Sequence, residues 1–386
     1  MGKNTMTSFS RPTAIFLMAA TAALSACGPR IPETLTIAVA QPLSGPSAAR
    51  GQDLLNGAKL AIDEINKAGF KIAGKPVTLE LVSADDKADP AEAKNAAQSL
   101  VERKVFAVLG HLSSDVTEAT IPIYRQGDVI QIFTSSASEL TKQGEGNTFR
   151  LVANDELQAK AVVGYLSDTL RAKKVAIIHE DTAFGNPMRR DIAAALKKVG
   201  ASLEAEQAVS NKVTDFAPFV AKLKAAPPDV LVAVLRDPQL IPLGQQLREA
   251  GLSDLKVIGT NSAKTTKMVK APADIKTLYL TSSALEPGEF TGGSEFRSKF
   301  RAEFKSEPVW GAHYAYDAIY VLAHTLRSVG SADKAAVRAK LHTIDAMAPV
   351  TSTMRFNAAG EQLYGAITVY ERRDGAWVPL VRSDQW

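Results

Sequence analysis

From residue 35 onwards, short apolar runs alternate with longer segments whose apolar residues recur at helical spacing. Leu35 to Ala40 is typical of a buried strand, and residues 53–68 place their apolar side chains on one helical face until Gly69 ends the helix. Asp89 and Pro90 then supply an N-cap and a first-turn proline for another helix. This βα alternation predicts parallel sheets with helices on both faces.

The same alternation restarts after residue 153. Further strands are expected at 76–82, 105–109, 129–133, 175–178, 230–235 and 256–258. Further helices are expected from about 114 and at about 155–172, 186–199, 215–225 and 239–250. Two successive sets of βα units predict an α/β protein with two doubly wound lobes.

The C-terminal part departs from this rhythm. The pattern of apolar residues there predicts a strand at 277–281 and helices at about 294–305, 311–328 and 333–343. It also predicts two final strands around the turn Arg373-Asp374-Gly375. Such a tail fits a chain that returns to the first lobe and finishes on the second. We therefore expect a linker at 27–34, lobe one at 35–152 plus 282–352, and lobe two at 153–281 plus 353–386.

The N-terminus has the pattern of an export signal. Lys3 and Arg11 are the only charges in residues 1–26, and they precede a short apolar run that is too Ala-rich for a stable membrane span. The run ends in Leu24-Ser25-Ala26-Cys27, which resembles the bacterial lipobox. This predicts a lipoprotein signal peptide at 1–26 and lipidation of Cys27, with the protein anchored in the periplasm or at the cell surface. The alternative is an ordinary signal peptide followed by a chance cysteine.

Composition removes several function classes. Cys27 is the only cysteine, so an intrachain disulfide, thiol catalysis and a cysteine-based zinc site are excluded. The 386 residues exceed what one core usually supports, which agrees with two lobes. The net charge of +4 is spread along the chain, so nothing indicates nucleic acid as a partner. The five histidines show no metal-ligand spacing, and no metal or cofactor is expected.

Open α/β sheets bind ligands at the carboxyl ends of their strands, so the loops there are the candidate site. The loop 41–46 is rich in glycine and proline, although an ordinary βα turn would look the same. In the loop 110–115, backbone N–H groups and hydroxyls at a helix start suit an anion. Ser114 or Asp115 could instead cap that helix, and the lone His111 is interpreted as structural.

A third loop places hydroxyls directly after a strand. Thr134, Ser135 and Ser136 follow the strand 129–133, and Ser138 comes soon after. Together with Ser114, these residues are candidates to hold a carboxylate between two loops. The competing interpretation is a solvated polar loop.

Taken in order, several segments resemble one family along almost the whole chain after Cys27. They are 39–46, Gly51 with the helix 57–66, Asp85-Asp86, 110–114, 136–141, Phe184-Gly185 and 314–318. The chain is thereby similar to the type I periplasmic binding proteins of branched-chain amino acid transporters, the leucine-binding protein-like family. The resemblance implies two lobes joined by three crossovers, with the ligand in the cleft.

The resemblance also assigns roles to single residues. The positions of Ser114 and of Thr134, Ser135 and Ser136 hold the ligand carboxylate in the family's amino-acid binders. An acidic residue that pairs with the ligand ammonium in those proteins falls at Asn261 here. Aromatic neighbours of the ligand fall near Arg50 and Arg236, while Phe184 keeps an aromatic ring at a third position.

These departures predict a ligand other than an ordinary branched-chain amino acid. A carboxylate with no amine, or with a second acidic group, fits a site that lacks the counter-charge for an ammonium. An aromatic or dicarboxylic acid would satisfy this. Two alternatives remain: Asp181 or Asp237 could replace the missing carboxylate, and Arg50 and Arg236 could be solvated rim charges.

The leading functional hypothesis is a monomeric transport receptor that captures a small carboxylate-bearing solute, an amino acid or related organic acid, for an ABC permease in the inner membrane. The alternative is a ligand-sensing module of the same fold that acts on another envelope protein. An enzyme ranks third, because the sequence has no Gly-x-Ser-x-Gly elbow and no phosphate loop. Asp85-Asp86 could mimic a catalytic pair, but adjacent carboxylates at a strand end usually cap a turn.

Overall fold

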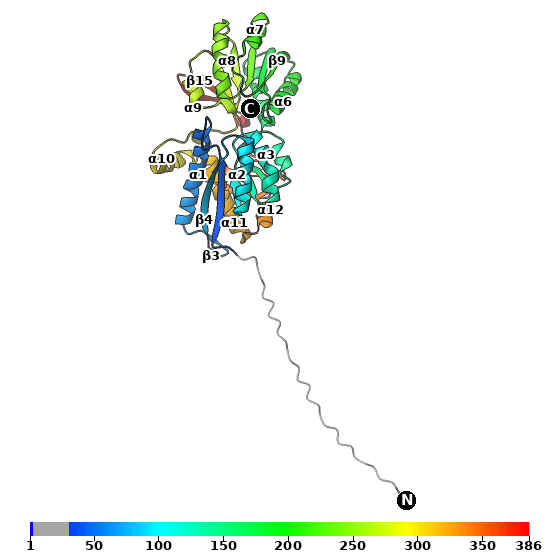
Figure 1. Ribbon diagram of the computed structural model, residues 1–386, viewed down its shortest axis with the longest axis vertical. Helices are drawn as coiled ribbons and strands as arrows, with labels where there is room; N and C mark the ends of the chain where they lie inside the picture. Colours follow the sequence, from blue (N-terminus) through cyan, green and yellow to red (C-terminus); the bar gives the residue numbers. More distant parts are fainter. Residues whose placement is uncertain (3–30, 386) are drawn as a thin grey trace.

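A computed structural model describes residues 1–2 and 31–385. It shows two α/β lobes stacked along the long axis of the molecule (Figure 1). Within those residues no helix combines the length and apolar character needed to span a membrane. Most of the predicted signal peptide, with Cys27, lies outside the described residues.

The first lobe is built on a five-stranded parallel sheet. Its strands, in spatial order, are β4 (Thr78–Asp85), β1 (Thr34–Gln41), β5 (Ala107–Leu109), β6 (Ile130–Phe133) and β7 (Thr148–Arg150). Successive residues of a strand point to opposite faces. Accordingly Ile37 and Val39 pack with α1 (Ala48–Lys67) and α11 (Ala312–Val329), whereas Ala38 and Ala40 pack with α2 (Pro90–Glu102) and α3 (Ser114–Gln126).

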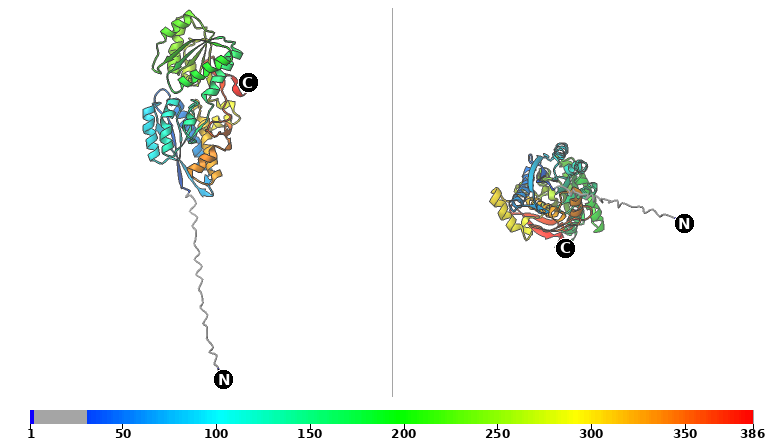
Figure 2. Two further views of the ribbon diagram at one scale, coloured as in Figure 1. Left: turned by 90° about the vertical axis from the view of Figure 1, so that its right-hand side faces the viewer. Right: turned by 90° about the horizontal axis from the view of Figure 1, so that it is seen from below.

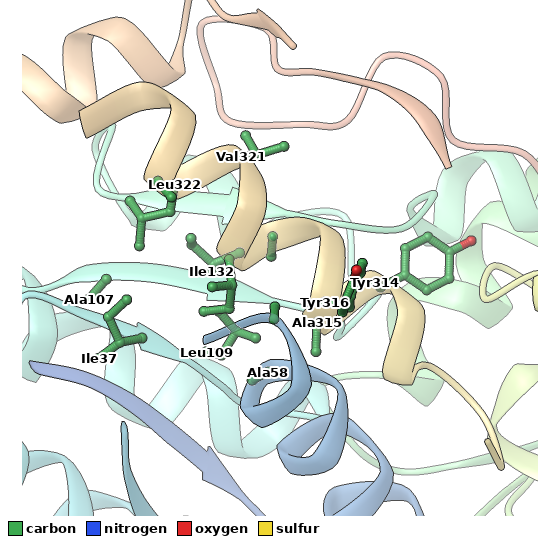
Figure 3. Packing of buried hydrophobic residues seen from close by; sticks show 14 of the residues in the cluster. Ile37, Ala58, Ala107, Leu109, Ile132, Tyr314, Ala315, Tyr316, Val321 and Leu322 are labelled. Carbon is green, nitrogen blue, oxygen red and sulfur yellow. The ribbon is translucent and has the colours of Figure 1, made fainter. Parts of the chain in front are cut away.

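The α11 side of this sheet carries the larger core. Figure 3 shows α11 lying across the strands, with Ala315 above Ala58 of α1 and with Ile132 and Leu109 beneath. The two helices approach so closely that a Cβ at Gly57 would lie 1.9 Å from the carbonyl oxygen of Ala312. Glycine is therefore required at this helix crossing.

The start of α11 is held from α1 by a buried carboxylate. Asp53 accepts hydrogen bonds from the backbone N–H groups of Val309, Trp310, Gly311 and Ala312 at 2.7 to 2.9 Å. The N–H groups of Gly311 and Ala312 are donors of the helix N-terminus that have no partner within α11, and those of Val309 and Trp310 belong to the segment just before it. Burial raises the pKa of Asp53, while the four N–H groups lower it. This contact fixes Trp310, which lies beside the cavity described below.

The second lobe contains a seven-stranded sheet. In spatial order its strands are β16 (Ala376–Arg382), β15 (Thr368–Arg373), β12 (Leu278–Ser282), β11 (Lys256–Gly259), β10 (Val230–Val234), β8 (Lys174–Glu180) and β9 (Ser202–Val209). β15 pairs antiparallel with both neighbours, and the other strand pairs are parallel. Helices cover both faces of this sheet. One face is covered by α5 (Asp155–Gly164), which a π-helical turn at Tyr165–Thr169 continues, and by α6 (Gly185–Lys198). The other face is covered by α7 (Ala217–Ala225) and α8 (Asp237–Glu249).

The remaining elements are short or lie at the edges of the lobes. They are β2 (Lys71–Ile72), β3 (Lys75–Pro76), α4 (Leu140–Gln143), α9 (Thr266–Lys270), α10 (Gly293–Phe304), α12 (Lys334–Leu341), β13 (Asp345–Ala348) and β14 (Ser352–Arg355). Figure 2 shows α10 and α12 on the first lobe and the C-terminal strands on the second.

The predicted α/β class with two parallel-rich sheets is confirmed. The chain passes between the sheets after β7, after β12 and before β15. β14 pairs with β13, and Phe356 packs in the first-lobe core, so the chain stays with the first lobe beyond residue 352. The exact division into domains remains a proposal.

Candidate ligand-binding site

A cavity of about 390 Å³ lies between the lobes. Loops at the carboxyl ends of strands from both sheets enclose it, together with the start of α1 and the segment before α11. Seven of the eight predicted site residues line it: Arg50, Ser114, Thr134, Ser136, Phe184, Arg236 and Asn261. Ser135 is the exception, because its hydroxyl donates to Thr117 Oγ1 at 2.8 Å inside the loop.

Three hydroxyls of the first lobe form one wall; we call Ser114, Thr134 and Ser136 the hydroxyl cluster. All three residues are buried. The helix α3 is capped at Ser113 without a side-chain bond, so neither Ser114 nor Asp115 is the capping residue. Ser114 Oγ instead accepts from the backbone N–H of Ala137 at 3.3 Å, and the buried Thr134 Oγ1 finds no partner in the described part of the chain. The cluster thus offers hydroxyl donors beside a helix N-terminus, an arrangement that suits an anion.

A buried arginine, not identified from the sequence, holds this loop in place. Arg150 donates to the carbonyl oxygens of Ser135 and of Ala137, the latter at 2.7 Å. It also forms an ion pair with Glu361, with nitrogen–oxygen distances of 2.9 and 3.1 Å. Glu361 lies between β14 and β15, in the segment that leads to the third passage between the lobes. Arg150 therefore joins the hydroxyl cluster to this connecting segment.

The adjacent aspartates Asp85 and Asp86 hold neighbouring loops of the first lobe together through hydrogen bonds. Asp85 Oδ1 accepts from the backbone N–H of Leu43 at 2.8 Å and of Lys87 at 2.9 Å. Asp86 Oδ2 lies 2.6 Å from Nδ1 of the fully buried His111. Both aspartates are therefore turn-forming and structural, as is His111. No group of three or more potential metal ligands occurs in the described ranges.

The second-lobe wall of the cavity includes Asn261. Hydrogen bonds to Gln158, which does not line the cavity, determine how its side chain is oriented. The backbone N–H of Asn261 donates to Gln158 Oε1 at 3.2 Å, and Thr281 Oγ1 donates to the same oxygen at 3.0 Å. Since a backbone N–H can only donate, the Gln158 oxygen must face it. Gln158 Nε2 then donates to Asn261 Oδ1 at 3.2 Å. Asn261 therefore keeps its NH₂ group, a donor, for the cavity.

Gln158 also connects Asn261 to a buried carboxylate. Its Nε2 donates to Asp155 Oδ1 at 3.0 Å, and Asp155 lies beside the Ser136 hydroxyl. Burial raises the pKa of Asp155 to about 7, although Ser136 and Arg150 act in the opposite direction. One polar network thus runs under the cavity from the hydroxyl cluster to Asn261.

Arg50 lines the cavity and reaches across it. Its Nη2 donates to the carbonyl oxygens of Ser262 and Lys264 on the second lobe, both at 3.1 Å. The guanidinium carbon lies 5.7 Å from the centre of the Trp310 ring. Burial lowers the pKa of Arg50 to about 10, a value at which it stays protonated at neutral pH. Arg50 is therefore more than a solvated rim charge.

Arg236, which belongs to the second lobe, also connects the lobes. Its Nη2 lies 3.3 Å from Asp115 Oδ2 on the first lobe and 3.5 Å from Glu180 Oε2 on its own lobe. Burial raises the pKa of Glu180, and the charge of Arg236 lowers it. Two carboxylates thus share one guanidinium at this edge of the cavity.

Cationic side chains predominate around the cavity. Among the described residues that line it, five are cationic, namely Arg50, Lys87, Arg236, Lys264 and Lys267, and Asp237 alone is acidic. Asp237 accepts from Thr265 Oγ1 at 3.2 Å. Asp181, the other carboxylate considered from the sequence, does not line the cavity and accepts from Asn186 at 2.7 Å.

Lys264 and Trp310 also line the cavity, although no sequence pattern indicated either of them. Lys264 forms an ion pair with Glu286 and lies 4.4 Å from the ring centre of Tyr370. Trp310 is buried, and its Nε1 has no hydrogen-bond partner in the ranges that the structure describes. Its position follows from the contact of Asp53 with the start of α11, which is a long-range contact.

Two α/β lobes around a small cavity lined by cationic and hydroxyl-bearing side chains define a two-lobed solute-binding protein. The chain belongs to the periplasmic binding protein family, which matches residues 34–376. It is 30% identical over 349 residues to an "Amino acid binding protein" of Pseudomonas aeruginosa, covering 88% of this chain and 90% of that protein. The expected membership of the type I, Leu/Ile/Val-binding family is confirmed. The chain is accordingly a transport binding protein and not an enzyme.

Solved structures share this fold. The branched-chain amino acid transporter substrate-binding protein LivJ from Streptococcus pneumoniae, in complex with isoleucine, has a TM-score of 0.77 at 25% identity, covering 90% of this chain and 99% of that one. The solute-binding protein of an ABC transporter from Rhodopseudomonas palustris BisB5, in complex with 3,4-dihydroxybenzoic acid, has a TM-score of 0.77 at 23% identity, covering 91% and 97%.

Proposed function

We propose that this protein captures a small carboxylic acid that has no free amine and delivers it to an ABC importer. One observation carries the proposal: of the six charged residues among the described residues that line the cavity, five are cationic. The hydroxyl cluster, the Asn261 NH₂ group and the five cationic residues all suit an oxygen-bearing anion. Asp237 alone among the lining residues described could pair with a cation.

The orientation of Asn261 argues against a zwitterionic amino acid. Where the family's amino-acid binders place an acidic residue against the ligand ammonium, this chain would present an NH₂ group. A buried ammonium without a partner costs several kcal/mol, and a facing donor adds repulsion. The relatives support an organic acid as well as an amino acid, since one solved relative is a complex with isoleucine and another with 3,4-dihydroxybenzoic acid.

A matched pair of ligands tests the proposal. Leucine and 4-methyl-2-oxopentanoate share a carboxylate and a side chain and differ in the amine. We expect refolded, ligand-free protein to bind the oxo acid at least about ten-fold more tightly in calorimetric titrations. Benzoate and 3,4-dihydroxybenzoate complete the panel, with isoleucine and valine as further amino acids. Micromolar binding of any of the three amino acids, with weaker binding of the oxo acid, would contradict the proposal.

We propose further that the protein is exported and anchored through lipidated Cys27. Leu24-Ser25-Ala26-Cys27 has the lipobox pattern, and a thioether-linked lipid with an N-acyl chain would supply the two anchors that stable attachment needs. Cys27→Ser should move the protein from the detergent-soluble membrane fraction to the aqueous fraction. A variant that stays with the membrane would place the anchor elsewhere.

A further inference from the structure

Two polar side chains at the cavity lie beside each other and do not belong to the hydroxyl cluster. They belong to Arg50, in the first turn of α1, and Trp310, just before α11; we call them the arginine–indole pair. Both residues line the cavity. The guanidinium carbon lies 5.7 Å from the centre of the indole ring, so the two side chains are direct neighbours at the edge of the cavity.

Arg50 is held in place by hydrogen bonds that leave some of its N–H donors unused. Its Nη2 makes both bonds to the second lobe, at 3.1 Å each. In the part of the chain that the structure describes, Arg50 forms no ion pair with a carboxylate, and its Nε and Nη1 make no hydrogen bond. Three other cations that line the cavity, Lys87, Arg236 and Lys264, are each paired with a carboxylate. Arg50 is thus the cation best placed to receive an anion.

Trp310 carries an unpaired donor beside Arg50. Its Nε1–H is buried and has no hydrogen-bond partner among the described residues. An unsatisfied buried donor costs about 1–3 kcal/mol, so it indicates a missing partner. An anionic oxygen bound to Arg50 is a chemically suitable acceptor, because the indole is a donor only.

We propose that the arginine–indole pair is a second anion subsite and that the ligand is a dicarboxylic acid. One carboxylate is held by the hydroxyl cluster, and the other by Arg50 and by Trp310 Nε1. A guanidinium binds a carboxylate through two parallel hydrogen bonds, which gives direction as well as charge. This inference rests on the proposed function and narrows its ligand from a carboxylic acid to one with two acidic groups.

The experiment compares acids that differ by one carboxylate. Adipate is paired with hexanoate, and benzene-1,4-dicarboxylate with benzoate, each titrated calorimetrically into refolded full-length mature protein. In at least one pair, the diacid should bind about ten-fold or more tightly than the monoacid, as expected for hydrogen bonds to a charged group. The ratio of the two affinities is the readout, because any change in lobe closure affects both ligands of a pair.

Two variants locate the second carboxylate. Arg50→Gln should reduce the diacid-to-monoacid ratio by about ten-fold, whereas Trp310→Phe, which keeps the aromatic surface, should reduce it by about three-fold or more. Lys59→Gln on the same helix carries the same change in charge outside the cavity and serves as the control. It should leave the ratio unchanged.

The outcomes separate this inference from the proposed function. Monoacids that bind as tightly as diacids in both pairs overturn the second subsite and leave the proposed function standing. Equal loss for both ligands of a pair in Arg50→Gln and Trp310→Phe also overturns it. Binding of leucine without binding of any acid contradicts the proposed function itself.

Discussion

The two walls of the cavity are built in different ways. The first-lobe wall presents the hydroxyls of Ser114, Thr134 and Ser136 on loops that directly follow strands. The second-lobe wall presents Asn261 and charged side chains whose partners come from distant segments. The first wall therefore follows from local sequence, whereas the chemistry of the second depends on contacts made only in the folded protein.

The largest effect is expected at the support of the first wall. Arg150→Met should destabilise the protein by roughly 3–5 kcal/mol, because it leaves Glu361 without its buried partner and two carbonyl groups without donors. Urea unfolding monitored by circular dichroism measures the change. Arg125→Met, which breaks an exposed pair with Glu145, is the control and should cost less than about 1 kcal/mol. Equal losses in the two variants would show that Arg150 has no special role.

The hydroxyl cluster should separate binding from stability. Ser114→Ala should weaken binding of an acid ligand about ten-fold or more, since a hydrogen bond to a charged group is lost. Thr134→Val should weaken it similarly but leave the unfolding free energy of the empty protein unchanged or higher, because this buried hydroxyl has no partner among the described residues. Calorimetry and thermal denaturation of both variants provide the measurements. Unchanged affinity in both would exclude the cluster from the site.

The network under the cavity should make stability depend on pH. The pKa of Asp155 is about 7 in the folded protein, against about 3.9 for an unfolded aspartate. Between these values folding takes up a proton, so stability falls as pH rises from about 4 to 7, by up to roughly 4 kcal/mol. Asp155→Asn should remove this part of the slope.

Melting temperatures measured from pH 4 to pH 8 test this. Asp317, whose pKa burial raises to about 6, remains in the variant and supplies a residual slope of the same sign. Parallel curves for the parent protein and Asp155→Asn would show that Asp155 contributes nothing to the pH dependence.

The smallest effect is expected at the ion pair between the walls. Arg236 and Asp115 are partly exposed, so their pair contributes at most about 1 kcal/mol to the contact between the lobes. Asp115→Asn should weaken ligand binding by less than about five-fold, and the loss should shrink in about 1 M salt. Titrations at low and high salt measure it, with Glu118→Gln on the same helix as control. A loss that persists in high salt would mean that the role of Asp115 is not electrostatic.

The sequence predicted the fold well wherever the signals were local. Asp89 caps α2 and Pro90 begins it, as expected, and most strands and helices lie within a few residues of their predicted positions. β9 was missed although Leu203, Ala205 and Val209 alternate with exposed residues, a pattern typical of an edge strand. β13 and β14 are too short to give a clear pattern.

For the candidate site, the strand-end hydroxyls and the two arginines were found, since their positions follow from the alternation of strands and loops and from the resemblance. Lys264 and Trp310 were missed because the residues that position them, Glu286 and Asp53, lie far away in sequence. The orientation of Asn261 could not be predicted, because its Oδ1 accepts from Gln158, which lies far away in sequence.

The contact between Gln158 and Asn261 has an evolutionary consequence. Gln158 does not line the cavity, yet it determines whether a solute meets an oxygen or an NH₂ group there. Exchange of a residue in this buried layer would invert the polarity of the site while every cavity-lining residue stayed the same. Descendants of one ancestral receptor could in this way diverge in their nutrient without any visible change in the binding pocket itself.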